Sequence, residues 1–468
     1  KDAAAVAPYG LGGANGVILI TTKKGQSGAP TLSFNGYYGY QTPTYIPKML
    51  NAADYMRLRN EAYLNENPGG SQLPFAEDLI NDYGNLHAQD PDKYPDSDIR
   101  DIMHMRAPIQ NYNLRLSGGA ERIKYYLGVG YIDQDGMLSP VNFRRYNYNI
   151  NVEAKATRTT TVTASLIGAV EKARSIDPGG SMSGFFRSLF KFIPVANLTY
   201  SNGLPGSFAS NAPAGVLNAG YVRRNSNTLL TTLSIEQQLP FVKGLSLKAT
   251  FSYDPYSSTV KSWHTPSYFY SQNTTVSPYE YTKQVSTGDN AGETYSWLSQ
   301  EYMKSQSFTY QLYLNYDNTF GKHHFTGLIV GEARNNTYEE FMARRNRFAV
   351  DIDELSLGSS DRNDFDNAGV SSTGSQMGLV YRAGYDFDNK YLLEASGRYD
   401  GHYYFAPGKR WAYFPAFSAG WVISREDFFK VFFIDHLKIR GSWGKSGNLA
   451  GYPFQYLNAY DLYSNAYA

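Results

Sequence analysis

Residues 145–155, RYNYNINVEAK, alternate between two kinds of side chain at every step. One set is apolar and consists of Tyr146, Tyr148, Ile150, Val152 and Ala154. The other set is polar and consists of Asn147, Asn149, Asn151, Glu153 and Lys155. Successive side chains of a β-strand point to opposite faces, so this segment predicts a strand with one apolar face and one wet face.

The same alternation recurs along the chain and predicts about thirteen strands of roughly ten residues each, the length that crosses a bilayer when a strand is tilted. Clear examples lie within residues 111–117, 125–131, 161–166, 245–254, 308–317, 381–386, 393–400 and 437–444.

The links between these predicted strands alternate between long and short. The long links lie near residues 42–108, 173–225, 263–305 and 346–372, and the tight turns lie near 117–122, 156–160, 240–244, 321–324 and 388–390. A transmembrane barrel has short turns at one rim and long loops at the other. A soluble β-sandwich is not expected to place its long and short links at opposite ends. We therefore interpret the apolar face as facing lipid and the polar face as lining a lumen. A large soluble β-protein is the alternative.

Composition is compatible with this interpretation. The 468 residues carry a net charge of +1, which gives no indication of a nucleic-acid partner. No apolar run approaches the roughly 18 residues of a membrane helix, and the mean hydropathy of −0.45 does not exclude a barrel whose strands have one wet face. The chain has 41 tyrosines and no cysteine, so it has neither a disulfide framework nor a thiolate metal site.

Residues 16–25, GVILITTKKG, do not follow the alternation. Four consecutive apolar residues followed by a basic end predict a strand buried on both faces, within a separate compact domain. We expect that domain to occupy residues 1–27 and the β-barrel to occupy residues 28–468. The first and last residues resemble internal segments of a protein rather than its termini, so we expect the chain to be part of a longer protein.

Several long motifs resemble one family. Residues 1–25, KDAAAVAPYGLGGANGVILITTKKG, resemble the end of the plug domain of SusC-like (SusC/RagA) TonB-dependent outer-membrane transporters. Residues 50–63, 107–136, 391–429 and 437–448 resemble, in the same order, that family's first-loop helix and several of its barrel segments. The resemblance implies an all-β fold: about 13 of roughly 22 antiparallel barrel strands, preceded by the end of the plug.

The resemblance also implies a function. It implies active import of a nutrient, foremost an oligosaccharide, across the outer membrane of a Bacteroidetes-type bacterium. The implied partners are a SusD-like surface lipoprotein and the TonB complex, which would engage a TonB box upstream of Lys1. Peptide import by the same mechanism is one alternative, and a surface glycan-binding β-protein that does not transport is another. No enzyme activity, cofactor or nucleic-acid partner is expected.

The charged side chains of the polar face are the candidate site residues, either as contacts of the plug or as the lining of a substrate path. They are Arg115, Glu153, Lys155, Lys248, Glu394, Arg398, Asp400, Lys438 and Arg440. No catalytic arrangement is legible. We predict no metal site, because residues 361–366, DRNDFD, lack the glycine and closing glutamate of a calcium loop. His323 and His324 are adjacent and would face opposite ways on a strand.

Overall fold

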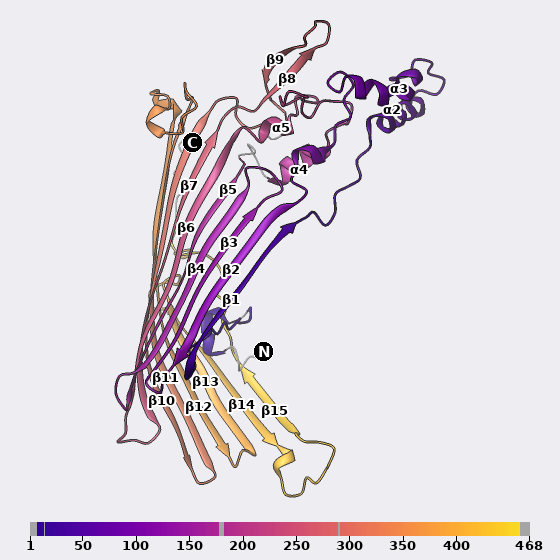
Figure 1. The fold of residues 1–468 in the computed structure, drawn as a ribbon. Coiled ribbons are helices and arrows are strands. Elements are labelled where there is room, and N and C mark those ends of the chain that lie inside the picture. The colour runs from indigo at the N-terminus through magenta and orange to yellow at the C-terminus, as the bar shows by residue number, and fades with distance from the viewer. Residues whose placement is uncertain (1–6, 14, 177–181, 289–290, 459–468) are drawn as a thin grey trace.

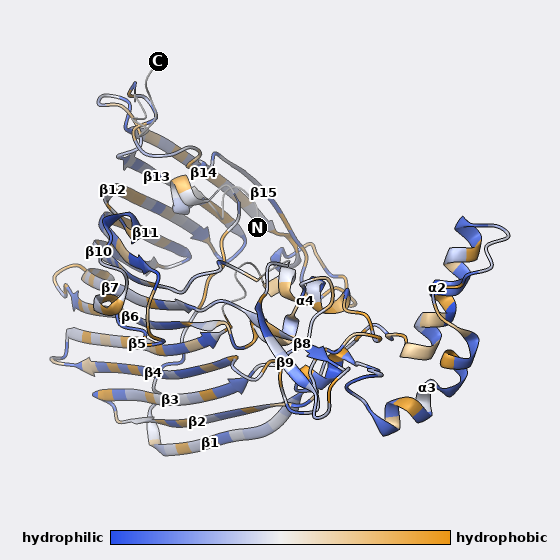
Figure 2. Cartoon of the chain, turned by 90° about the horizontal axis from the view of Figure 1, so that it is seen from above, coloured by the Kyte–Doolittle hydropathy of each residue, from blue (hydrophilic) through white to orange (hydrophobic). Residues whose placement is uncertain are grey.

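The computed structural model describes residues 7–13, 15–176, 182–288 and 291–458. Its main feature is one antiparallel sheet of thirteen strands, in which strands adjacent along the chain are paired, apart from an inserted hairpin (Figure 1). The strands are β1 (Gly28–Gln41), β2 (Ala107–Gly119), β3 (Ile123–Asp135), β4 (Asn142–Lys155), β5 (Thr160–Ser175), β6 (Gly220–Gln238), β7 (Leu245–His264), β10 (Trp297–Phe320), β11 (His323–Asn346), β12 (Phe365–Phe387), β13 (Tyr391–His402), β14 (Trp411–Val422) and β15 (Lys438–Gly444). Seen from above, the sheet curves around a concave side (Figure 2).

The number of strands in the sheet agrees with the alternation, but several strands are longer than expected. β10 and β11 each have 24 residues, and β6, β10 and β12 begin at Gly220, Trp297 and Phe365, before the predicted ends of the long links. These extensions mix polar and apolar side chains on both faces, so they lack the period-two signal. Pairing between neighbouring backbones extends the strands where the side-chain pattern has stopped.

The strand register separates the two faces that the sequence predicts. Tyr148 stands opposite Val129 and Gly168, and Leu312 stands opposite Ala249 and Gly331. This face carries large apolar side chains that are mostly open, such as Leu393 with 56% of its surface exposed. A soluble sandwich would cover such a face, and an uncovered apolar band of this extent marks an interaction surface.

The links are sorted by length as predicted. The long ones gather at one end of the sheet and the tight turns at the other (Figure 1). Asp388 and Asn389 both have a φ of 55°, which is the left-handed pair that a two-residue hairpin turn requires. The link after β14 is longer than the other turns and contains the short 3₁₀ helix η5 (Ile423–Arg425).

The long links contain all of the α-helices in the described residues. They are α2 (Ala52–Glu66), α3 (Glu77–Gln89), α4 (Met182–Phe190) and α5 (Pro213–Val216), with the 3₁₀ helices η2 (Ile99–Ile102), η3 (Leu355–Leu357) and η4 (Arg362–Asp364) and the hairpin of β8 (Tyr268–Asn273) and β9 (Glu280–Val285). The helix predicted at residues 50–63 is α2, and Asn51 caps it by accepting a hydrogen bond from the Asp54 N–H. No described helix is long and apolar enough to cross a membrane.

The loops contain a buried apolar cluster of their own. Phe185 and Leu189 of α4 are fully buried and pack with Ile99, Leu138 and Ile176. Burial of such side chains contributes about 1.5–3 kcal/mol each. The loops at this end are therefore a packed layer with a core of their own.

The strand predicted within residues 16–25 is wrong. The described residues 17–27 have no helix or strand assignment and no ladder partner, and Ile18 is 90% exposed. The apolar run indicated burial, but a strand also needs a neighbouring backbone, and no described segment pairs with this one. Residues 1–6 and 14 of the predicted domain lie outside the described residues.

Two tryptophan substitutions test whether the open apolar face lies in lipid. Leu393→Trp in the full-length protein should be nearly neutral, because fluid acyl chains adapt to the larger ring. Leu298→Trp should lower the free energy of unfolding by about 1–3 kcal/mol, because Leu298 is fully buried beside Phe348 and Leu355. Leu393→Arg should cost about 2–4 kcal/mol near the bilayer midplane.

The measurement is reversible unfolding from lipid vesicles. Equal damage from Leu393→Trp and Leu298→Trp would mean that the face of Leu393 packs against protein.

Candidate functional site: a buried ion cluster beneath the N-terminal segment

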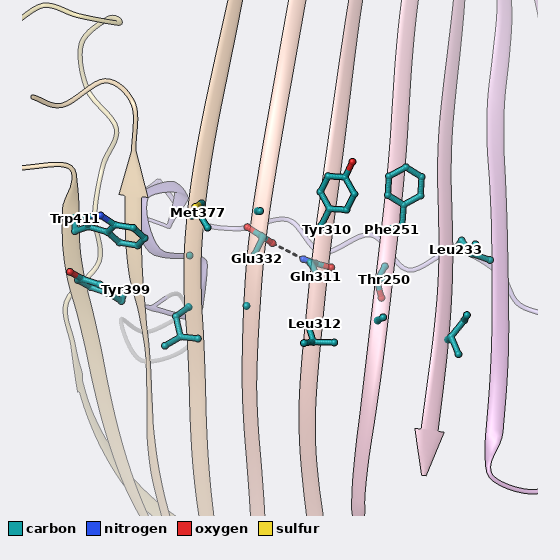
Figure 3. Close-up of a pocket in the computed structure, with 16 residues that line it drawn as sticks. Leu233, Thr250, Phe251, Tyr310, Gln311, Leu312, Glu332, Met377, Tyr399 and Trp411 are labelled. Atoms are coloured by element: carbon teal, nitrogen blue, oxygen red, sulfur yellow. Dashed lines mark hydrogen bonds between the residues drawn. The ribbon is translucent and has the colours of Figure 1, made fainter. Parts of the chain in front are cut away.

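A cluster of charged side chains from β11 and β13 lies on the polar face. Arg398 pairs with Glu332 across 2.7 Å, between Nη2 and Oε1, and its Nε donates to Asp400. The second carboxylate oxygen of Glu332 accepts a hydrogen bond of 2.6 Å from Gln311 Nε2 on β10 (Figure 3). The three charged side chains are 6–11% exposed. Breaking a pair this well buried leaves an uncompensated charge, so the three groups act as one unit.

The N-terminal segment rests on this cluster. η1 (Ala7–Gly12) packs against β13 and β14, and the Leu11 N–H donates to Asp400 Oδ2 at 3.1 Å. The Gly10 carbonyl accepts a hydrogen bond of 3.3 Å from the Gly447 N–H, which follows β15. The contact between segment and sheet therefore includes backbone hydrogen bonds, one of them to a carboxylate that Arg398 holds in place.

Gly10 is required at this contact for two reasons. Its φ is 55° and its ψ is −125°, a conformation that disfavours any residue with a Cβ. A Cβ there would also collide with the carboxylate of Asp400 and the side chain of Arg398. The glycine lets the backbone come close enough for the Leu11 N–H to reach Asp400.

A cavity of about 770 Å³ lies beside the contact, between the N-terminal segment and the polar face of β10 to β13. Its wall combines charged and amide groups with tyrosines and aliphatic side chains. The lining includes Tyr9, Gln311, Tyr313, Arg334, Gln376 and Arg398. Such a mixed wall can hold water and hydrogen-bond a polar solute.

The register places all nine predicted site residues on the same face of the sheet, the face that carries Asp400. It does not bring them to one place. Arg398 and Asp400 meet the N-terminal segment, whereas Glu394, Lys438 and Arg440 line a separate cavity of about 360 Å³ near the short turns. Their roles remain predictions.

The remaining candidates do not line either cavity. Glu153 pairs with Lys124 at 3.2 Å, and Lys248 lies 5.6 Å from the ring centroid of Tyr313. Arg115 and Lys155 have no ion pair within the described part of the chain.

Sequence reasoning missed Glu332 and Gln311 as members of the site. Glu332 lies between Gly331 and Ala333, two small residues on the opposite face. The alternation there is weak, although a charged residue flanked by small ones in a predicted strand was an available signal.

Gly331 and Ala333 have a second effect, on the apolar face. Together with Ala249 on β7, they leave a groove of about 650 Å³ that crosses the sheet from Leu233 on β6 to Trp411 on β14. Figure 3 shows Tyr310 and Leu312 on one side of β11 and Met377 on the other. The groove is apolar and lies on the face away from the ion cluster, so it is not part of the polar site.

Two segments were considered as possible metal sites in the sequence, residues 361–366 and the pair His323 and His324. Asp361 accepts a hydrogen bond from the Asn363 N–H, and Asp364 pairs with Arg347 at 3.1 Å. His323 bonds to Tyr385, and His324 bonds to Asp317. Within the described ranges, no group of three potential ligands is placed to hold a metal ion.

Comparison with known proteins relates this arrangement to a family. No family model matches the chain. It is 25% identical to the TonB-dependent receptor SusC of Bacteroides thetaiotaomicron, over 100% of the chain and 44% of SusC. It is 26% identical to the TonB-dependent receptor P3 of Formosa agariphila, over 98% of the chain and 42% of P3.

The fold agrees with these sequence matches. The structure of the RagAB peptide transporter superimposes with a TM-score of 0.77 and 22% identity, over 96% of this chain and 51% of that one. In sequence and in fold the chain is similar to the SusC-like TonB-dependent receptors. Receptors of this type are outer-membrane β-barrel proteins, and the relatives are receptors and transporters rather than enzymes. The SusC-like chain spans less than half the length of these curated relatives.

The contact between η1 and β13 is testable by hydrogen exchange. In the full-length SusC-like receptor, Asp400→Ala removes the acceptor of the Leu11 N–H and the partner of Arg398 Nε. We expect amide exchange in residues 8–13 to become at least about tenfold faster, which corresponds to losing a charge-assisted hydrogen bond of about 1.5–3 kcal/mol.

Glu394→Ala is the control, because Glu394 pairs with Arg382 on the same face of the sheet but does not line the cavity beside η1. Mass spectrometry of peptides from residues 8–13 would measure the exchange. Unchanged exchange in Asp400→Ala would show that the hydrogen bond does not hold the segment.

Proposed function

We propose that the full-length protein imports a nutrient across the outer membrane, with energy supplied through a TonB complex. In this proposal residues 1–27 are the end of a plug and residues 28–468 are part of the surrounding barrel. The observation that carries the proposal is the seating of η1 on the polar face through the Leu11–Asp400 hydrogen bond. The similarity to the TonB-dependent receptor SusC supports it.

The geometry suggests how the plug moves. The contact is polar, and the cavity beside it is lined by groups that water can solvate. Pulling η1 from the face exchanges a few protein hydrogen bonds for bonds to water, and the net cost of each is small. The Arg398–Glu332 pair lies wholly within the sheet, so it can remain intact when the segment leaves.

The proposed partner outside the cell is a SusD-like lipoprotein. The loop layer is suited to support it, because its elements are fixed to one another. Asp92 accepts hydrogen bonds of 2.7 Å from both the N–H and the hydroxyl of Ser201, and one of 2.9 Å from the Tyr281 hydroxyl on β9. Burial, together with the bond to Asp92, raises the pKa of Tyr281 to about 12, so this phenol stays a donor at neutral pH.

We propose an oligosaccharide as the substrate. A peptide is the second candidate, because a protein that shares the fold is named as a peptide transporter. The test is uptake by cells that express the full-length receptor with its own lipoprotein, with and without TonB. Fluorescent oligosaccharides and peptides would be compared.

TonB-dependent accumulation of oligosaccharides would support the proposal, and accumulation of peptides would support the second substrate. Surface binding that never becomes internal, with or without TonB, would contradict transport and favour a glycan-binding surface protein.

Tethering the plug should separate binding from transport. Residues 1–468 contain no cysteine. Leu11→Cys with Asp400→Cys, in a full-length receptor from which any cysteine elsewhere has been removed, gives a specific pair of thiols for a short, reductant-cleavable crosslinker. We expect the crosslinked receptor to bind substrate at the surface but to lose at least about nine-tenths of its uptake, because a covalent bond resists a pull that breaks hydrogen bonds of about 1 kcal/mol each.

Reductant should restore uptake to the level of the same double variant before crosslinking. A tethered receptor that still imports at that level would rule out movement of this segment as a step of transport.

A further inference from the structure

Five cationic side chains lie on the outward, apolar face of the sheet, beyond the end of its apolar band. They are Arg144 on β4, Lys172 and Arg174 on β5, Arg223 on β6 and Lys261 on β7. The register places Arg174 directly opposite Arg223, and Arg223 directly opposite Lys261. Arg144 is directly opposite Lys172. We refer to these five residues as the outer basic patch.

Protein carboxylates neutralise only part of the outer basic patch. Arg144 pairs with Asp133 at 3.1 Å, and Lys261 pairs with Asp353 at 2.9 Å. Lys172, Arg174 and Arg223 have no carboxylate partner among the described residues. Like charges directly opposite on neighbouring strands are destabilising. Arg174 and Arg223 face each other in this way without a carboxylate partner among the described residues, so a bound anion would stabilise them.

The patch is held in place by Tyr221, which is almost fully buried. The guanidinium carbon of Arg223 lies 3.9 Å from the centroid of the Tyr221 ring, and that of Arg174 lies 5.5 Å from it. The Tyr221 hydroxyl donates to Asp353, the carboxylate that also holds Lys261. These contacts order the cations before any ligand arrives, which lowers the entropic cost of binding.

A cavity of about 690 Å³ adjoins the patch at the loop end of the sheet. Arg174, Tyr221 and Trp263 line it, together with Ser139 of the β3–β4 link. Asp101 and Asp351 also contribute to its wall. An arginine beside aromatic rings and hydroxyl groups suits a phosphorylated sugar, since the guanidinium binds the phosphate and the rings pack on the sugar.

The distance of the outer basic patch from the apolar band indicates which layer of the membrane surrounds the patch. Tyr146 and Val170 are the last apolar residues of the outward face on β4 and β5, and Lys172 and Arg174 follow two and four residues later. With about 3.3 Å per residue and a strand tilt of about 40°, Arg174 lies roughly 10 Å beyond the apolar band. This is the depth of lipid headgroups, on the side of the long loops.

We propose that the outer basic patch binds the phosphate groups of a glycolipid in the outer leaflet of the membrane. This inference rests on the proposed outer-membrane function. The nutrient itself is not the expected occupant, because the patch is on the face opposite to Asp400 and the cavity beside η1.

The experiment uses the full-length receptor in detergent micelles and diphosphorylated lipid A as the probe. Arg174→Gln with Arg223→Gln removes two cations of the patch. Arg145→Gln with Arg224→Gln is the matched control, because it removes two exposed arginines from the opposite face of β4 and β6. Circular dichroism of both variants verifies the fold.

We expect the patch variant to bind lipid A at least about tenfold more weakly than the unaltered receptor, as expected for two cations near an anionic surface. The control variant should bind within about twofold of the unaltered receptor. Lipid A without its phosphates should bind weakly to all three proteins. Equal losses in both variants, or equal binding of the dephosphorylated lipid, would overturn the proposal.

A further outcome concerns protein partners. Unchanged lipid binding in the patch variant, with reduced recovery of the lipoprotein partner, would make the patch a protein interface and refute the proposal. Because the readout is lipid binding rather than uptake, a receptor that fails to import any nutrient still gives a clear result for the patch.

Discussion

The register of strand pairing in the sheet is the constraint on which the rest of the structure depends. Thirteen strands pair in chain order, so each residue lies opposite partners that point the same way. A slip of one residue would turn the apolar side chains of a strand toward the polar side and would separate Arg398 from Glu332. The apolar band, the ion cluster and the outer basic patch are therefore consequences of one pairing scheme.

The polar face combines fixed and removable contacts. Arg398, Glu332 and Gln311 join β10, β11 and β13 through side chains of the sheet itself. The N-terminal segment adds only hydrogen bonds to this arrangement, and Gly10 brings its backbone close enough to form them. A wall that keeps its own charges paired can release the segment without exposing an unpaired charge.

The strands also extend beyond the apolar band toward the long loops. Ladder pairing continues there although apolar and polar side chains no longer alternate, and it places Arg174, Arg223 and Lys261 in one row. The loops above are not loose connections. Phe185 and Leu189 give them a buried core, and Asp92 ties the β8–β9 hairpin to the segment that follows α4.

The sequence by itself determined the strand count in the sheet, the two faces and the sorting of links by length. These depend on periods of two and on turn residues such as Asp388 and Asn389, which are local signals. It also marked Arg398 and Asp400 as polar-face residues, but not that they meet.

Only the tertiary structure decided which polar-face charges form a site, because Glu332 and Arg398 are brought together by strand pairing across 66 positions of sequence. It also decided that residues 17–27 lack a strand partner. An apolar run such as that of Ile18 signals burial, but whether a neighbouring backbone is present depends on the whole fold.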